Sequence, residues 1–308
     1  MRKPNLLTGP TAFVTGLAVS AAARAQEAAQ TLDIVGRPHA GGTGFQPAAT
    51  SLAVDQQWLD HLLLWLCIGV VALVMVLLAV VILRFNARSN PKPSTFTHNT
   101  PLEITWTLIP VLILVVLAVF SLPVLFKQQT IPEADVTIKV TGNQWYWSYE
   151  YPDAGFGYDS YLIGHPATLG DEDAGAVPYV LNDAMVKRLE RSGYTKDEFL
   201  LATDTAVVVP VGKKVVMLVT GSDVIHSWTV PAFAVKQDAV PGRTARLWFK
   251  PDREGVFFGQ CSELCGKDHA FMPITVKVVS QAVYDQWLAA SKAAGGYTEP
   301  AVQIAAAN

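Results

Sequence analysis

Charge and cysteine are both scarce in this 308-residue chain. Charged residues make up 16% of the sequence against 51% hydrophobic residues, and the formal net charge is only −3. A nucleic-acid-binding surface needs an excess of lysine and arginine, so we expect no nucleic-acid partner. Such an apolar composition instead indicates membrane-spanning segments. With only three cysteines, the chain is also not a disulfide-rich secreted scaffold.

Two long stretches contain no charged residue at all, residues 62–83 and 104–126. Each is long enough, as a helix, to cross about 30 Å of hydrocarbon. We therefore predict a two-helix transmembrane hairpin over residues 61–130. Pro110 and Pro123 lie inside the second span, where proline is expected to bend the helix.

The N-terminus has the features of an export signal. It begins with basic residues, continues through a small, apolar stretch and reaches Ala-Arg-Ala at 23–25. This pattern predicts a signal peptide over residues 1–25, followed by an exported segment over 26–60. A first transmembrane helix is the alternative, but the continuous apolar run is too short to span a bilayer.

The orientation of the hairpin follows from the charges that flank it. The connection between the spans, residues 84–103, holds Arg84, Arg88 and Lys92 against a single acid, Glu103. Because short basic loops stay in the cytoplasm, both flanks are expected on the outer face of the membrane.

Residues 131–281 have a different texture, with short β-prone runs separated by turn-forming residues. This pattern predicts an all-β sandwich or barrel. An irregular insertion at about 164–200 contains one short predicted helix over 182–192, and a C-terminal helix and tail are expected over 282–308. The predicted strands are 136–140, 145–151, 206–209, 215–220, 245–249, 255–258 and 274–279.

Between the last two predicted strands lies Cys261-Ser-Glu-Leu-Cys265-Gly-Lys-Asp-His269-Ala-Phe-Met272. A disulfide is the simplest interpretation for an exported protein, but it leaves the histidine and methionine unexplained. Zinc would accept the two thiolates and two imidazoles, with His226 as the fourth ligand, but it has no use for a thioether. Thiolate, imidazole and thioether together are the ligand set of a copper electron-transfer site.

A mononuclear copper site of that kind needs only one thiolate. Because a thiolate sulfur can bridge two metals, two cysteines can join two copper ions, each of which takes one imidazole. Sharing the charge over two metals lowers the reorganisation that accompanies electron transfer. The residues therefore favour a binuclear electron-transfer copper site on a β-barrel, with His226 placed at the end of a neighbouring strand.

The motif Cys-x-Glu-x-Cys-x₃-His-x₂-Met, the upstream Ser-Asp-Val-Ile-His-Ser-Trp and the two-span hairpin together resemble subunit II of the haem–copper cytochrome c oxidases, most closely the alphaproteobacterial form. The resemblance runs from about Gly36 to Val279. It includes Gly-Phe-Gln-Pro at 44–47, Phe-Thr-His-Asn-Thr-Pro-Leu-Glu at 96–103, Gln-Trp-Tyr-Trp-Ser-Tyr-Glu-Tyr-Pro at 144–152 and Val-Lys-Gln-Asp-Ala-Val-Pro-Gly-Arg at 235–243.

The resemblance implies a membrane-anchored all-β protein with a cupredoxin-like Greek-key β-barrel that carries a CuA centre. The two cysteines would bridge two copper ions and each histidine would bind one of them. Met272 and the main-chain carbonyl of Glu263 would be weak ligands, while the Glu263 side chain would reach a magnesium or manganese ion shared with subunit I. The implied metal residues are His226, Cys261, Glu263, Cys265, His269 and Met272.

The resemblance also implies the function and the partners. The chain would accept electrons from cytochrome c and pass them to haem a in subunit I of a proton-pumping oxidase, where oxygen is reduced to water. The haem would belong to that partner only. Other oxidase subunits and membrane lipid would surround the hairpin in the bacterial inner membrane, with both termini and the copper domain in the periplasm.

Three further residue roles are expected on the same basis. Trp145 would be the point of electron entry, and Glu103 the entrance to a proton channel of subunit I. Residues 131–180 hold eight acids against one base, Lys139, a balance that suits steering of a lysine-rich partner. The candidate docking acids are Glu150, Asp153, Asp159, Asp204 and Asp223.

Two rival functions share part of this pattern. A membrane-tethered copper chaperone or thiol oxidoreductase also uses paired cysteines and a histidine, but it usually has a thioredoxin-like βαβ pattern and does not need Met272. The quinol-oxidase counterpart shares the hairpin and the barrel but lacks the copper ligands.

Overall fold

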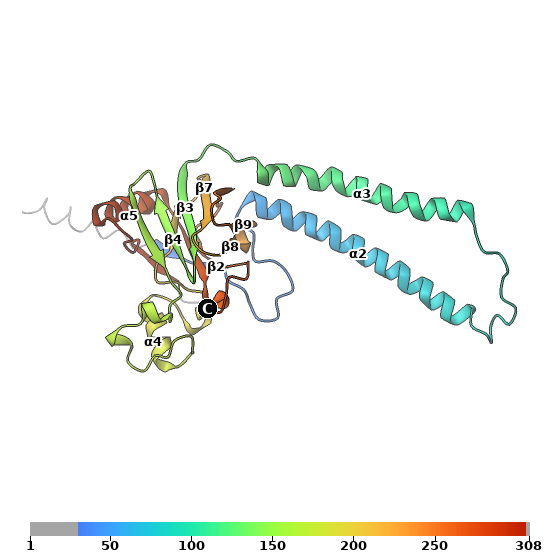
Figure 1. Ribbon diagram of the computed structural model, residues 1–308, viewed down its shortest axis with the longest axis horizontal. Helices are drawn as coiled ribbons and strands as arrows, with labels where there is room; N and C mark the ends of the chain where they lie inside the picture. The colour runs from blue at the N-terminus through green and yellow to red at the C-terminus, as the bar shows by residue number, and fades with distance from the viewer. Residues whose placement is uncertain (1–29, 306–308) are drawn as a thin grey trace, which may run out of the picture.

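The computed structural model describes residues 30–305 (Figure 1). The chain forms a long helical hairpin that extends away from a β-rich domain. The predicted signal peptide lies outside the described residues, as do the last three residues of the predicted tail.

The hairpin consists of α2 (Ser51–Arg84) and α3 (Thr100–Gln129). Both helices are long and apolar enough to cross a membrane, and the most apolar stretch of each is not buried within the protein. Their apolar side chains therefore require lipid or a partner around them. The first helix begins at Ser51 rather than near residue 61, because the Thr50 hydroxyl accepts a hydrogen bond from the Ala53 N–H and caps it there.

Polar and aromatic contacts join the two helices near the β-rich domain. Lys127 of α3 forms an ion pair with Asp55 of α2 at 2.5 Å, and the rings of Trp58 and Phe120 meet edge to face. Charged residues are costly inside hydrocarbon, so this ion pair marks the level at which the helices leave the membrane.

Two main sheets face each other in the β-rich domain, and hydrogen bonding among the described strands does not close them into a barrel. The first has the order β10-β7-β3-β4-β5, and the second β2-β11-β12-β6. A separate hairpin, β8-β9, lies beside the start of α2 (Figure 1). The strands are β2 (Ile34–Gly36), β3 (Val136–Asn143), β4 (Tyr146–Tyr151), β5 (Phe156–Ser160), β6 (Val207–Pro210), β7 (Val215–Gly221), β8 (His226–Val230), β9 (Val235–Ala239), β10 (Ala245–Phe249), β11 (Gly255–Gln260) and β12 (Pro273–Val279).

Large aromatic side chains fill the space between the two sheets. Along β4, Trp147, Tyr149 and Tyr151 point inward at alternate positions and are almost completely buried. Phe233 lies between Phe249 and Phe257, with ring centroids 4.8 Å from each. Each buried aromatic ring removes roughly 150–250 Å² from water, so this layer dominates the stability of the domain.

All seven predicted strands are present, with small differences at their ends. The hairpin β8-β9 and strands β2 and β5 are additional, as are two short strands near the ends of the described residues, β1 (Gln30–Leu32) and β13 (Val302–Ile304). His226 was expected at the end of a strand, and it is the first residue of β8, which begins after β7 has ended at Gly221. The chain bends over residues 222–224 between these two strands.

The insertion and the C-terminus are more ordered than the sequence suggested. Helix α4 (Asp183–Arg191) is capped by Asn182, in agreement with the predicted helix, and both Arg188 and Arg191 form ion pairs with the buried Asp173. Helix α5 (Gln281–Ala294) is also confirmed. Part of the tail forms a strand, because β13 (Val302–Ile304) pairs in parallel with β1 (Gln30–Leu32).

Candidate metal centre and electron-entry surface

The candidate metal centre lies in the loop that joins β11 to β12, residues 261–272. These strands are antiparallel neighbours that pair up to Gln260 and Pro273, so the loop closes on itself at one pole of the domain. The Cys261 N–H donates to the Met272 carbonyl at 3.0 Å, which fixes its base. The Ser262 N–H donates to the Ser227 carbonyl at 2.9 Å, which attaches the loop to β8.

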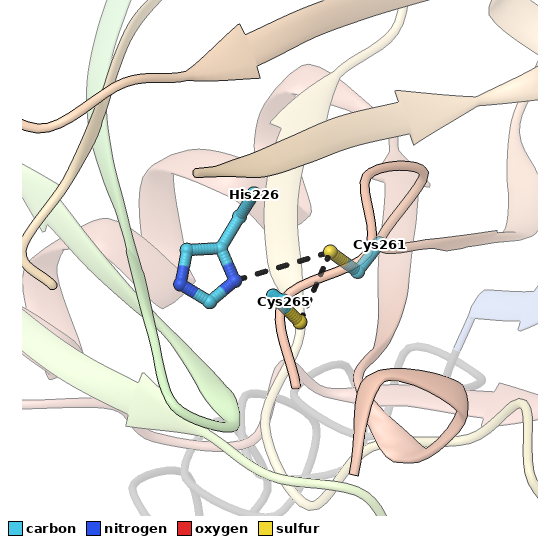
Figure 2. Close-up of side chains that lie close together, drawn as sticks. All are labelled: His226, Cys261 and Cys265. Atoms are coloured by element: carbon cyan, nitrogen blue, oxygen red, sulfur yellow. Dashed lines mark hydrogen bonds between the residues drawn. The ribbon is translucent and has the colours of Figure 1, made fainter. Parts of the chain in front are cut away.

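This attachment brings His226 to the two cysteines (Figure 2). The Sγ atom of Cys261 lies 3.9 Å from Nδ1 of His226 and 3.8 Å from Sγ of Cys265. On the other side, Sγ of Cys265 lies 3.5 Å from Nδ1 of His269. Both cysteines and His226 are buried. The structure therefore brings together the four strongest donors predicted from the sequence.

The two sulfurs are not bonded to each other, since both cysteines are free and a disulfide requires about 2.05 Å between sulfurs. Burial alone would raise the pKa of Cys261, but its hydrogen bonds, above all that with His226, hold the pKa below its usual value. Burial and the nearby charge of Cys261 raise the pKa of Cys265. A cation between the sulfurs is what would let both cysteines be thiolates at neutral pH.

The separations of the donor atoms limit how many of them one metal ion could bind. Donors of a single tetrahedral ion with bonds of about 2.3 Å lie at most about 3.8 Å apart. The donor atoms of His226, Cys261 and Cys265 lie within 4.8 Å of one another, whereas His269 falls outside this cluster although it adjoins Cys265. Each sulfur thus has an imidazole nitrogen of its own nearby, His226 beside Cys261 and His269 beside Cys265.

Met272 and Glu263, the two weak ligands expected from the sequence, lie in the same loop as the cysteines. Met272 is buried directly after the short helix His269–Phe271. The main-chain carbonyl of Glu263 accepts a contact of 3.3 Å from the Cys261 thiol, while the residue itself is exposed. Thioether and carbonyl oxygen are weak copper ligands, so the donor set fits copper and leaves the Glu263 side chain free for another partner.

The insertion supports this loop from outside. The ring of Tyr179 stacks on Phe271 with centroids 4.3 Å apart and an interplanar angle of 20°. Phe271 stands between two candidate ligands, His269 and Met272. The insertion therefore restrains the turn that presents both of them.

The ring of His226 is held on its far side by Asp223. The Oδ1 atom of this carboxylate lies 2.9 Å from Nε2 of His226, and Oδ2 accepts a hydrogen bond from the Gln144 N–H at 2.8 Å. A carboxylate in this position fixes the ring orientation and keeps Nδ1 free for a metal. Gly142 provides the space, because a Cβ atom there would come within 2.7 Å of the imidazole.

We expect Asp223→Asn to weaken copper binding by roughly tenfold or more and to raise the reduction potential, because the charge that supports His226 is lost. Copper titration and potentiometry of the full chain measure both effects. Asp159→Asn is the control, since it removes an exposed acid that does not contact a candidate ligand. Equal changes in the two variants would contradict a positioning role for Asp223.

Trp145 lies directly against the metal loop. Its Nε1–H donates to the Cys265 carbonyl at 3.1 Å, and the Gln144 side-chain amide donates to the same oxygen at 3.1 Å. The ammonium of Lys267 lies 5.3 Å from the centroid of the indole ring. At Gly266, where φ is +124°, a Cβ atom would come within 3.0 Å of the indole, so the close approach of Trp145 requires glycine.

Comparison with known proteins identifies the family of this chain. Residues 136–279 match the family profile of the cytochrome c oxidase subunit II periplasmic domain, and residues 38–124 match that of its transmembrane domain. The chain belongs to the cytochrome c oxidase subunit II family. It is 56% identical over 299 residues to cytochrome c oxidase subunit 2 of Cereibacter sphaeroides, which covers 97% of this chain and 95% of the relative.

Two further similarities concern other bacteria. A probable cytochrome c oxidase subunit 2 of Rickettsia bellii is 42% identical, covering 80% of this chain and 82% of the relative. The crystal structure of the periplasmic domain of subunit II of cytochrome oxidase from Bradyrhizobium japonicum is 43% identical, covers 54% of this chain and all of that chain, and has a TM-score of 0.42.

The predicted docking acids of this subunit II chain fall into two groups. By the register of β4, Glu150 lies roughly 16 Å along the strand from Trp145 and pairs with Lys139, and Asp153 lies farther still. Asp159, Asp204 and Asp223 lie closer to the Trp145 end. Asp204 accepts hydrogen bonds from the Tyr161 and Thr205 N–H groups, and burial raises its pKa.

Glu103 lies at the opposite end of the hairpin from the β-rich domain, in the first turn of α3. Its Oε1 atom accepts a hydrogen bond from the Asn99 N–H at 3.2 Å, while Asn99 Oδ1 accepts one from the Leu102 N–H. The carboxylate thus completes a reciprocal cap of the helix.

Proposed function

We propose that this chain accepts electrons from a cytochrome c at a binuclear copper centre and passes them to a haem in subunit I of the oxidase. Membership of the subunit II family supports the assembly. The observation that carries the copper assignment is the pairing of each cysteine sulfur with a separate imidazole nitrogen, at 3.9 and 3.5 Å.

The chain would hold the metals with Cys261 and Cys265 as bridges, one histidine on each ion, and Met272 and the Glu263 carbonyl as weak ligands. When bound, such a pair supplies a one-electron carrier that changes its geometry little. The protein contributes burial of the sulfurs, which excludes water, and the Asp223 contact, which fixes His226. The ligands must be held rigidly if the site is to change its geometry little during electron transfer.

Trp145 would receive the electron, since its indole N–H contacts the carbonyl of a bridging cysteine. The acids near its end of β4, Asp159, Asp204 and Asp223, would attract a lysine-rich donor. Glu150 and Asp153 would contribute to the long-range field only, because they lie farther along the strand. The difference in distance between these two groups of acids supports a docking area centred on the start of β4.

Two further roles rest on position and family membership. The exposed Glu263 side chain would reach a magnesium or manganese ion at the boundary with subunit I. Glu103, at the far end of α3, would stand at the cytoplasmic entrance of a proton channel. Both agree with a hairpin oriented by its basic connection, which would place the copper domain in the periplasm of a bacterial inner membrane.

Copper loading tests the proposal. The full chain in detergent is expected to bind two copper ions and to give an electron paramagnetic resonance spectrum of one unpaired electron shared equally by two copper nuclei. A single copper ion, or a Cys261–Cys265 disulfide in active oxidase, would contradict it. A zinc preference would favour a structural site instead.

Trp145→Ala is expected to slow electron entry from cytochrome c by roughly 100-fold, because the route to the Cys265 carbonyl is lost. Stopped-flow reduction of the assembled oxidase measures the rate, and the copper spectrum should stay unchanged. Trp145→Phe is the matched variant, since it keeps a ring and removes only the N–H. Wild-type rates in Trp145→Ala would remove this residue from the electron path.

A further inference from the structure

A cavity of about 420 Å³, with both polar and apolar lining, lies where the helical hairpin meets the β-rich domain. It is bordered by the first turns of α2, the last turn of α3, the β8-β9 hairpin and β10. Figure 1 shows the start of α2 close to the β8-β9 hairpin. The Asp55–Lys127 ion pair lies on the same ends of the two helices. The cavity is therefore at the height of the lipid headgroups.

The charged residues that line the cavity are all basic. Lys236 and Arg246 are its charged residues, and no acid lines it. Arg246 has no carboxylate partner among residues 30–305, and the Lys236 ammonium reaches only the Ser262 carbonyl at 3.3 Å. The nearest basic group on the helices, Lys127, is already neutralised by Asp55.

The remaining wall offers hydrogen-bond donors and an apolar border. Four glutamine side chains line the cavity, and the hydroxyl of Thr229 is buried there without a hydrogen-bond partner in the described part of the chain. Trp248 closes one side, with its indole N–H donating to the Lys127 carbonyl at the end of α3. Phe45 and Leu52 add apolar surface next to the helices. The glutamines are Gln56, Gln128, Gln129 and Gln237.

We propose that this cavity binds the headgroup of an anionic phospholipid. Two cations would contact the phosphate, amide and hydroxyl groups would contact the glycerol oxygens, and the acyl chains would run down the apolar surface of the hairpin. A lipid in this place would fix the angle between the hairpin and the domain that carries the copper ligands. The inference requires only that the helices cross the membrane, and it is independent of the proposed copper chemistry.

The test uses the full chain extracted from membranes that contain phosphatidylglycerol and phosphatidylcholine, with native mass spectrometry of the retained lipid. We expect selective retention of phosphatidylglycerol, reduced roughly fivefold in Arg246→Gln and further in Arg246→Gln/Lys236→Gln. Lys187→Gln on α4 is the matched control, since it removes an exposed charge outside the cavity. The copper spectrum of each variant reports whether the metal loop is intact.

Each other outcome overturns the proposal. Equal retention of the two lipids would show that charge does not select the occupant. Equal retention by the wild type and the double variant would place the lipid elsewhere. Competition by inorganic phosphate alone, with no lipid retained, would make this a simple anion site. Loss of selectivity in the assembled oxidase would show that a partner subunit fills the cavity.

Discussion

Cys261→Ser is expected to reduce electron transfer from cytochrome c through the assembled oxidase to below about one-hundredth of the wild-type rate. Losing even an outer partner of a metal ligand costs roughly 10–100-fold, and this change removes a proposed bridging ligand itself. A serine hydroxyl stays protonated at neutral pH and is a hard donor, so it cannot hold two copper ions together. Cys265 would remain close to His269 but would face one metal position only.

The matched control for this substitution is Cys67→Ser. Cys67 is also a free cysteine, but it is exposed on α2, away from the metal loop. Oxygen consumption, copper content and the paramagnetic resonance spectrum should be those of the wild type. A Cys261→Ser oxidase that still carries two coupled copper ions would show that the bridging assignment is wrong.

Local pattern was enough to predict most of the architecture. The charge-free stretches predicted both helices of the hairpin. Alternating or β-branched runs predicted the strands that flank the metal loop. The helix ends were less predictable, because Thr50 starts α2 well outside the apolar stretch through a capping hydrogen bond. Among the strands that were not predicted, β5 and β9 mix polar and apolar residues without clear alternation, and β1, β2 and β13 are only three residues long.

The candidate donors were also predictable, because cysteine, histidine and methionine rarely occur so close together without a shared role. The contacts that surround these donors could not be predicted. The Trp145–Cys265 hydrogen bond joins residues 120 positions apart, and Asp223 meets Gln144 across 79 positions. Such contacts depend on how β4, β7 and the metal loop come together. Asp223 was therefore predicted as a docking acid, while the structure also gives it a contact with His226.

The role of Gly142 and Gly259 was likewise hidden in the sequence, because a glycine in a strand usually weakens it. Each of these two glycines instead allows a close approach. Gly142 makes room for the His226 ring. Gly259 lies in β11, directly before the metal loop, and faces the main chain of β8 at Thr229.

Gly259→Ala is expected to lower the free energy of unfolding by roughly 3 kcal/mol and to weaken copper binding at the same time. A Cβ atom at this position would overlap the Thr229 carbonyl oxygen, which is main chain and cannot rotate away. The strands must therefore separate. Because β8 begins with His226 and β11 leads into Cys261, that separation pulls two candidate ligands apart.

Denaturant unfolding of the metal-free full chain, followed by copper titration, measures both effects. Gly44→Ala is the matched control, since a Cβ atom there meets nothing within 4 Å and its backbone is not in the left-handed region. We expect the control to unfold and bind copper like the wild type. If Gly259→Ala lost stability but kept the copper affinity of the wild type, the spacing of β8 and β11 would not determine the metal geometry. The contact between these strands would then serve the fold alone.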